Sequence, residues 1–240
     1  MEHVSESIYR LGTAIHNFYV IIEGGKATVV DAGCSKELSK LDEGLASLGM
    51  NLGDVEAIIL THAHPDHMGF AGEANAAGTE VRVSELEAPI ATGDQVGDQL
   101  KIRQLPLWKL RTWSFLIGLY EVGVTTAPRV ESVVTFGADD VLDLPGRPEV
   151  VPSPGHTIGH ACFYLRQSKT LFTGDALVTR DVLNHRDASP QLMPCVFHTD
   201  VVQARASLDA LTALDTELVL PGHGSPFHGQ VADAAKTALG

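Results

Sequence analysis

Short runs of β-branched and aromatic residues alternate along the chain with segments of helical periodicity. Residues 18–22 and 27–30 are two such runs, and the glycine-containing segment 23–26 between them predicts a hairpin. Residues 55–60 form an apolar run that predicts a buried strand, and residues 80–83 predict another. The first part of the chain therefore indicates a sheet.

Apolar residues three or four positions apart predict helices between the strands. One helix is expected over 35–48, where Gly49 follows a stripe made of Leu38, Leu41, Leu45 and Leu48. The small residues of 69–77 predict a second helix. A third is expected over about 200–214, with the apolar stripe Val201, Ala204, Leu208 and Leu211.

The second half of the chain has the same organisation as the first. Strands are expected at residues 149–151, 161–165, 170–173 and 217–220. In both halves the strands lead directly into polar loops, and helices lie between them. This is the pattern of an α/β protein.

The strongest chemical signal is a histidine cluster that directly follows the strand predicted at 55–60. His62, His64 and His67, together with Asp66, place three imidazoles and a carboxylate within six residues. Side chains two apart in extended backbone point to one side, so His62 and His64 can bind one metal ion together. Pro65 then turns the chain, which lets Asp66 and His67 face a second ion.

Composition limits the classes of protein that fit this pattern. The chain has 240 residues and a net charge of 17 − 30 = −13, which opposes binding to nucleic acid. A single domain over 1–240 is expected. Three cysteines without a CxxC spacing, and an acidic start without a targeting signal, predict a cytoplasmic protein. The apolar stretch 105–120 contains Lys109 and Arg111, so no membrane span is expected.

Four motifs together resemble the metallo-β-lactamase superfamily over nearly the whole chain. The family signature resembles Thr61-His62-Ala63-His64-Pro65-Asp66-His67, and three later motifs match at His156, Asp175 and His223. The resemblance implies an αββα sandwich of two mixed sheets flanked by helices. It also implies that Asp31 is an aspartate that orients a ligand histidine.

The same resemblance implies two divalent metal ions. Metal 1 would be held by His62, His64 and His156, metal 2 by Asp66, His67 and His223, and both by the bridging Asp175. Nitrogen and oxygen ligands without a thiolate accept zinc, iron or manganese, with zinc expected first. Two ions lower the pKa of a shared water and polarise the oxygen under attack. Asp66 and Asp175 are therefore the expected catalytic residues.

Departures from known branches of the family narrow the expected reaction. Zinc β-lactamases commonly carry a cysteine at the position of Asp175, so antibiotic hydrolysis is not expected. The pattern is similar to hydroxyacylglutathione hydrolases and lactonases, although Val178 replaces a lactonase tyrosine and only 17 residues follow His223. The expected function is a dinuclear hydrolase that cleaves a thioester or lactone of a small-molecule acyl substrate with a bridging hydroxide.

Two alternatives remain open at this level. One is an iron-dependent dioxygenase of the persulfide type. Such enzymes of this superfamily use a single iron at a site similar to the one formed by His62, His156 and Asp175. The other is a metal-binding protein without turnover. Oxygen consumption with a persulfide would favour the dioxygenase. The absence of turnover with any acyl substrate would favour the metal-binding protein.

The segment from about 85 to 147 separates the two halves and is predicted to be a helical lid over the metals. Its stretch between Asp98 and Tyr120 contains both tryptophans, Trp108 and Trp113, and four basic residues: Lys101, Arg103, Lys109 and Arg111. Such a lid would offer an apolar wall and cations to a substrate. The same aromatic residues also suit packing on the core, a homodimer contact or an interfacial helix.

The remaining histidines and one cysteine lead to smaller expectations. His160 is expected to be a structural hydrogen-bonding residue. His185 and His198 lie on a loop where either could contact substrate. His3, His16 and His228 are interpreted as surface or core residues, and Cys34 as a buried thiol near the site.

Overall fold

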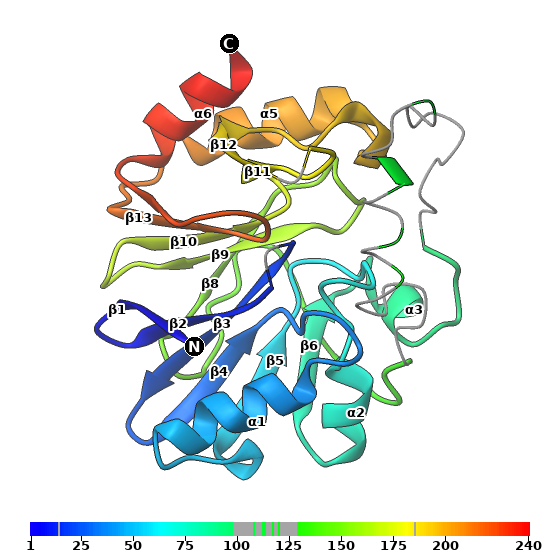
Figure 1. The fold of residues 1–240 in the computed structure, drawn as a ribbon, viewed down its shortest axis with the longest axis vertical. Coiled ribbons are helices and arrows are strands. Elements are labelled where there is room, and N and C mark those ends of the chain that lie inside the picture. Colours follow the sequence, from blue (N-terminus) through cyan, green and yellow to red (C-terminus); the bar gives the residue numbers. More distant parts are fainter. Residues whose placement is uncertain are drawn as a thin grey trace.

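Two β-sheets pack face to face, and helices cover the outer face of each (Figure 1). This is the predicted αββα sandwich. The computed structural model describes residues 1–13, 15–97, 108, 112–113, 117, 120, 129–184 and 186–240. All structural statements below concern these residues.

The first sheet has the strand order β1-β2-β3-β4-β5-β6-β7. Its strands are β1 Glu2–Ser5, β2 Ile8–Gly12, β3 Asn17–Glu23, β4 Lys26–Val30, β5 Val55–Ile59, β6 Glu80–Ser84 and β7 Val134–Phe136. Strands β1 to β4 pair antiparallel, whereas β4 to β7 pair parallel. The predicted hairpin is confirmed as β3 and β4.

The second sheet has the order β14-β13-β10-β9-β8, and a separate antiparallel pair joins β11 to β12. The bounds are β8 Glu149–Pro152, β9 Ala161–Leu165, β10 Thr170–Gly174, β11 Val178–Asp181, β12 Arg186–Gln191, β13 Leu218–Pro221 and β14 Phe227–His228. Strands β10 and β13 are parallel neighbours. All four strands predicted in this half are confirmed.

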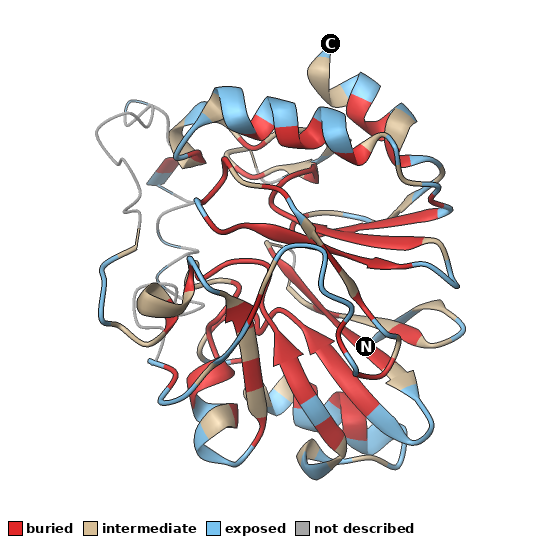
Figure 2. Ribbon diagram, turned by 180° about the vertical axis from the view of Figure 1, so that it is seen from behind, coloured by how far each residue is buried: buried red, intermediate tan, exposed pale blue. Residues whose placement is uncertain are grey.

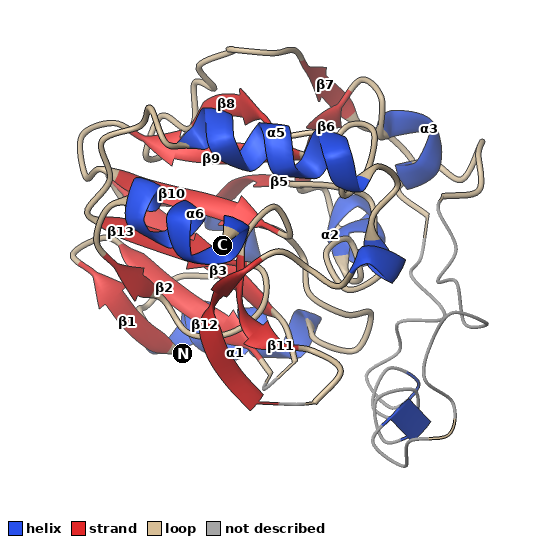
Figure 3. Cartoon of the chain, turned by 90° about the horizontal axis from the view of Figure 1, so that it is seen from above, coloured by secondary structure: helices blue, strands red, loops and turns tan. Residues whose placement is uncertain are grey.

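Helices lie on the outer face of each sheet, as the view from above also shows (Figure 3). They are α1 Leu38–Ser47, α2 Ala71–Ala76, α3 Ala88–Ala91, α5 Val201–Leu211 and α6 Val231–Leu239. Helix α5 begins at Asp200, whose carboxylate accepts hydrogen bonds from the backbone N–H groups of Val202 and Gln203. In the described ranges, no helix combines the length and apolar character that crossing a membrane requires.

Alternation along the strands builds the layers of the core (Figure 2). On β3, Phe18 and Val20 pack with the apolar residues of α1 and α2, whereas Tyr19 and Ile21 pack in the cluster between the two sheets. On β9, Phe163 joins this middle cluster, and Tyr164 joins the layer under α5 and α6. Strands buried on both faces therefore carry the continuous apolar runs seen in the sequence.

Of the segment predicted as a lid, the structure describes the two ends, residues 85–97 and 129–147, which belong to the sandwich, and between them only residues 108, 112, 113, 117 and 120. Strand β7 pairs with β6, and Val130, Phe136, Leu142 and Leu144 are buried in the core clusters. Trp108 and Tyr120 are mostly exposed. Residues 101, 103, 109 and 111 lie outside the described residues, so the lid stays a prediction.

Gly69 is the point of close approach that fixes the histidine loop on the first sheet. Its N–H donates to the Gly33 carbonyl at 2.9 Å, and Phe70 N–H donates to the Ala32 carbonyl at 3.0 Å. A Cβ at position 69 would lie 2.3 Å from the Cα and carbonyl carbon of Cys34. Only glycine fits here without moving backbone.

We therefore expect Gly69→Ala to lower the free energy of unfolding by about 3 kcal/mol, because two backbone segments would have to separate. Gly137→Ala is the matched control, since a Cβ there meets its nearest atom at 3.6 Å. Urea unfolding of both variants measures the difference. Equal stability of the two variants would contradict the close approach.

Candidate metal centre

The seven predicted ligand residues come from loops at the ends of strands in both sheets. His62, His64, Asp66 and His67 follow β5, while Asp175 follows β10 and His223 follows β13. His156 lies in the loop between β8 and β9. Because β10 and β13 are parallel neighbours, Asp175 and His223 leave the second sheet at the same edge. The structure brings all seven side chains together there.

Three imidazoles form the first group. The Nδ1 atom of His64 lies 3.0 Å from the Nε2 atom of His62 and 3.0 Å from the Nε2 atom of His156. All three nitrogens lie within 4.8 Å of one another, a spacing that can hold one metal ion. This is the set predicted for metal 1.

Asp66, His67 and His223 form the second group, also within 4.8 Å. Asp175 stands between the groups. Its Oδ1 lies 3.3 Å from His67 Nε2 and 3.2 Å from His223 Nε2, while its Oδ2 lies 3.3 Å from His156 Nε2. One carboxylate thus faces both groups, as a bridging ligand would.

The outer nitrogens of His67 and His223 are held by hydrogen bonds that leave Nε2 of each ring directed inward. Asp31 Oδ2 accepts from His67 Nδ1 at 2.9 Å, and Asp31 Oδ1 accepts from the backbone N–H of Thr61 at 2.8 Å. The carbonyl of Ile15 accepts from His223 Nδ1 at 2.5 Å. Such outer partners fix the tautomer and orientation of metal-binding histidines. The role predicted for Asp31 matches this geometry.

Buried atoms without hydrogen-bond partners mark the centre. Within the described ranges, His67 Nε2, His223 Nε2 and Asp175 Oδ1 are buried and make no regular hydrogen bond beyond the ion-pair contacts of Asp175 with the two rings. A buried polar atom without a partner costs free energy. A divalent ion would satisfy all three atoms at once, so the residues present fit a metal centre.

The pKa directions agree with a cation between these groups. Burial, followed by the neighbouring imidazoles of His67 and His64, holds the pKa of His62 well below its usual range. Burial opposes protonation of His67 too, but the carboxylates of Asp175, Asp31 and Asp66 outweigh it and raise the pKa of His67. Negative charge therefore concentrates around the second group, where an ion can replace the proton.

The other residues singled out in the sequence surround this centre. His160 hydrogen bonds to Ser153 Oγ at 2.8 Å and accepts from the Asp175 backbone N–H at 3.1 Å, which is the structural role expected of it. His198 is buried, with its ring 5.4 Å from that of His156, and Cys34 is buried as expected. His185 lies outside the described residues.

The supports of the His223 loop were missed at the sequence level. Asn17 Nδ2 donates to the carbonyls of Pro221 and Gly224 at 2.9 and 2.7 Å, and Tyr19 OH donates to that of Pro221 at 2.7 Å. Arg10 Nη1 donates to the Gly224 carbonyl at 3.1 Å. The sequence signal for these supports is Asn17, a polar residue at the start of a strand that is otherwise apolar.

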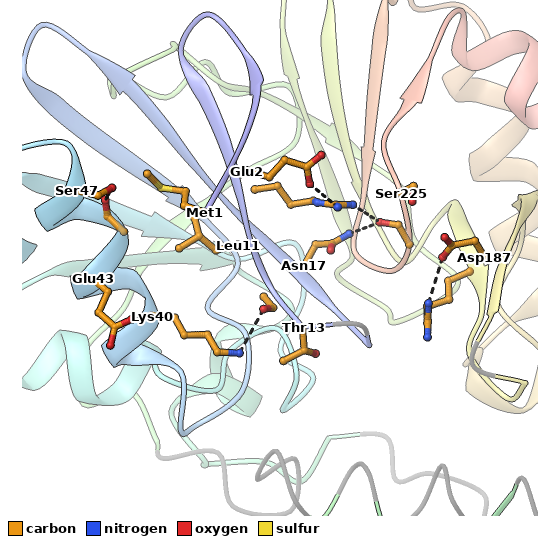
Figure 4. Close-up of a pocket in the computed structure, with 15 residues that line it drawn as sticks. Met1, Glu2, Leu11, Thr13, Asn17, Lys40, Glu43, Ser47, Asp187 and Ser225 are labelled. Carbon is orange, nitrogen blue, oxygen red and sulfur yellow. Dashed lines mark hydrogen bonds and ion pairs between the residues drawn. The ribbon is translucent and has the colours of Figure 1, made fainter.

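A polar cavity of about 760 Å³ lies beside these supports (Figure 4). Arg10, Asn17, Lys40 and Arg180 are among the residues that line it, whereas none of the seven candidate ligands does. Arg180 is paired with Asp187 at 3.2 Å. The cavity is therefore separate from the centre.

Comparison with known proteins agrees with this geometry. The family model for the metallo-beta-lactamase superfamily matches residues 11–223. The probable metallo-hydrolase YqjP of Bacillus subtilis is 27% identical over 217 residues, which are 86% of this chain and 66% of YqjP. A hydroxyacylglutathione hydrolase of Fuscovulum blasticum is 28% identical over 201 residues, 83% of this chain and 58% of that protein. The chain thus spans less than two thirds of either relative.

The fold is similar to that of a solved structure. The metallo-beta-lactamase family protein TTHA1429 from Thermus thermophilus matches with a TM-score of 0.70 and 24% identity. The match covers 96% of this chain and 77% of that protein. It confirms the sandwich architecture.

Replacing the carboxylate of Asp31 tests the outer hydrogen bonds. We expect Asp31→Asn to weaken metal binding by about 10- to 100-fold, because the amide cannot hold His67 Nδ1–H as the carboxylate does. Asp139→Asn is a matched control, since Asp31 and Asp139 both have φ 62° and Asp139 is exposed. Competition with a chelator measures the affinity, and equal affinities in the two variants would contradict this role.

Proposed function

Because the chain belongs to the metallo-beta-lactamase superfamily, we propose that it is a dinuclear metallohydrolase that cleaves a thioester or lactone. The observation that carries the proposal is the pair of three-ligand groups on either side of Asp175. Zinc is proposed for both positions, and the donor set also suits iron or manganese.

The second group favours two ions over one. A single-iron site at His62, His156 and Asp175 would leave Nε2 of His67 and His223 buried without a metal ion, with only the carboxylate of Asp175 facing them. A buried polar atom that makes no hydrogen bond and binds no ion costs about 1–3 kcal/mol of stability. An ion on the second group removes this cost, which supports the hydrolase over the dioxygenase.

The chain's own residues would prepare the site for hydrolysis. Two divalent ions, when bound, lower the pKa of a shared water and polarise a carbonyl oxygen. Burial opposes ionisation of Asp66, but His67 and His223 outweigh it and keep its pKa below the usual range. Asp66 is also more exposed than its partner His223, at 18% against 3% of the side chain. Asp66 is therefore ionised and partly exposed, so it can hold an ion of the second group and face a water molecule there.

Exposed apolar side chains beside the centre suit an acyl group. Ile158 lies two residues after His156 and is 60% exposed. Leu86 is 57% exposed, and its Cβ lies close to Gly159. A relative named hydroxyacylglutathione hydrolase agrees with an acyl substrate. Together these features support a substrate with an apolar chain next to the scissile carbonyl.

Turnover of a panel of thioesters and lactones tests the proposal. We expect the wild type to hydrolyse at least one class, and Asp66→Asn to lower kcat by about 100-fold or more, because it removes a carboxylate that serves the second group as ligand and faces the attacking water. Asp143→Asn, an exposed aspartate remote in sequence from the ligands, serves as control. Wild-type oxygen consumption with a persulfide, without hydrolysis, would contradict the proposal.

The acyl contact has a separate test. We expect Ile158→Ser to raise KM about tenfold for a long acyl chain and to leave kcat unchanged, because the contact binds ground state and transition state alike. Val202→Ser is the control, since Val202 is 79% exposed on α5. An unchanged KM for long chains in Ile158→Ser would exclude this residue from the acyl contact.

A further inference from the structure

The geometry points to Glu37 and His16 as positioning residues for His223, acting through the carbonyl of Ile15. This inference rests on the proposed two-metal centre and assigns a role to a buried pair outside it. His16 was interpreted from sequence only as a surface or core residue. In the structure it is fully buried, between the first turn of α1 and the loop that carries His223.

The turn between β2 and β3 holds His223 from outside the metal centre. His223 Nδ1 donates to the Ile15 carbonyl at 2.5 Å, and the N–H of Asn17 donates to the Gly222 carbonyl at 2.7 Å. The position of the Ile15 carbonyl therefore sets the orientation of the His223 ring. Neither contact involves the first ligand group.

The turn between β2 and β3 is shaped by local hydrogen bonds of its own residues. Thr13 N–H donates to the His16 carbonyl at 3.0 Å, and Ile15 N–H donates to Thr13 Oγ1 at 3.1 Å. Gly12 enters the turn with φ 120°, and a Cβ there would lie 2.2 Å from the His16 carbonyl oxygen. These local bonds shape the turn but do not attach it to α1.

Glu37, the residue just before α1, and Lys40, in the first turn of α1, make that attachment. His16 Nε2 donates to Glu37 Oε2, and both side chains are at most 4% exposed. Lys40 Nζ donates to Glu37 Oε1 at 2.6 Å and to the Gly12 carbonyl at 3.3 Å. Figure 4 shows Lys40 reaching from α1 toward the turn that carries Thr13. The turn is thus held at both ends by one helix.

The charge on Glu37 makes this attachment strong. Burial opposes ionisation, but hydrogen bonds from His16, Lys40 and the Cys34 N–H outweigh it and lower the pKa of Glu37 to about 2. Charge-assisted hydrogen bonds are about twice as strong as neutral ones. The pair therefore resists displacement of the turn.

A metal at this cluster fits less well than a positioning role. Ligand atoms of His16, Cys34 and Glu37 do lie within 4.8 Å of one another. However, both Glu37 oxygens already accept hydrogen bonds, Oε2 from His16 and from Cys34 N–H at 3.0 Å, and Oε1 from Lys40. The cluster is satisfied without an ion, unlike the centre beside it.

Stepwise Zn²⁺ titration of the metal-free protein against a chelator tests the inference. His223→Ala, which removes a ligand of the second group only, identifies the step that belongs to that group. We expect Glu37→Ala and His16→Ala to weaken this step by about 10- to 100-fold and to change the other by less than about twofold. Glu37→Gln keeps one oxygen acceptor for His16 but loses the charge and the second acceptor, so it should weaken this step less than Glu37→Ala does.

Glu43→Ala is the matched control, because it removes an exposed carboxylate from the same helix. Thermal unfolding of each variant shows that it is folded. If neither alanine variant folds, Lys40→Met should weaken the second step about threefold, since this side chain is 43% exposed and its loss spares the core. An unchanged second step in the folded variants, or equal weakening of both steps, would overturn the inference. A wild type that binds one ion would instead contradict the proposed function.

Discussion

Five imidazoles and two carboxylates converge at one end of the sandwich, and most of them are buried. Such a group of charged and polar side chains is costly to remove from water unless a counter-charge satisfies it. The Nε2 atoms of His67 and His223 and Oδ1 of Asp175, which are buried and make no regular hydrogen bond, show where the counter-charge belongs. The two sheets and their loops hold these side chains together in spite of the free-energy cost of burying them.

The two sheets divide this task. The first sheet supplies the histidine loop, which Gly69 and Asp31 attach to the end of β4. The second sheet supplies Asp175 and His223 from parallel neighbours β10 and β13. The centre therefore exists only where the sheets meet, and β3 connects them through Asn17 and Tyr19. Errors in the packing of one sheet on the other would therefore pull apart the members of each ligand group, because both groups combine residues of the two sheets.

Most strands of the sandwich and all seven candidate ligands were accessible from the sequence. Strands such as β3 and β9 are buried on both faces, so they carry apolar runs that can be recognised without partners. Strands β1, β11 and β12 are polar, because they lie at an edge or in a separate ribbon, and no alternation marks them. Strand β7 has only three residues, too few for a periodic signal.

The supports around the ligands were harder to predict for a different reason. His16 and Glu37 are 21 residues apart, and neither has a neighbour in sequence that suggests the pair. Their contact depends on α1 packing against the turn after β2, which is a tertiary event. Ligand histidines could be found because four of the seven ligands lie in one short motif, whereas their hydrogen-bond partners are spread over the chain.

The number of metal ions bound per chain tests the dinuclear centre most directly. Elemental analysis of protein purified without a histidine tag gives this number and the identity of the metal. Two ligand groups sharing Asp175 predict close to two divalent ions per chain. A single ion, and iron in particular, would contradict the dinuclear hydrolase and direct attention to oxygen chemistry.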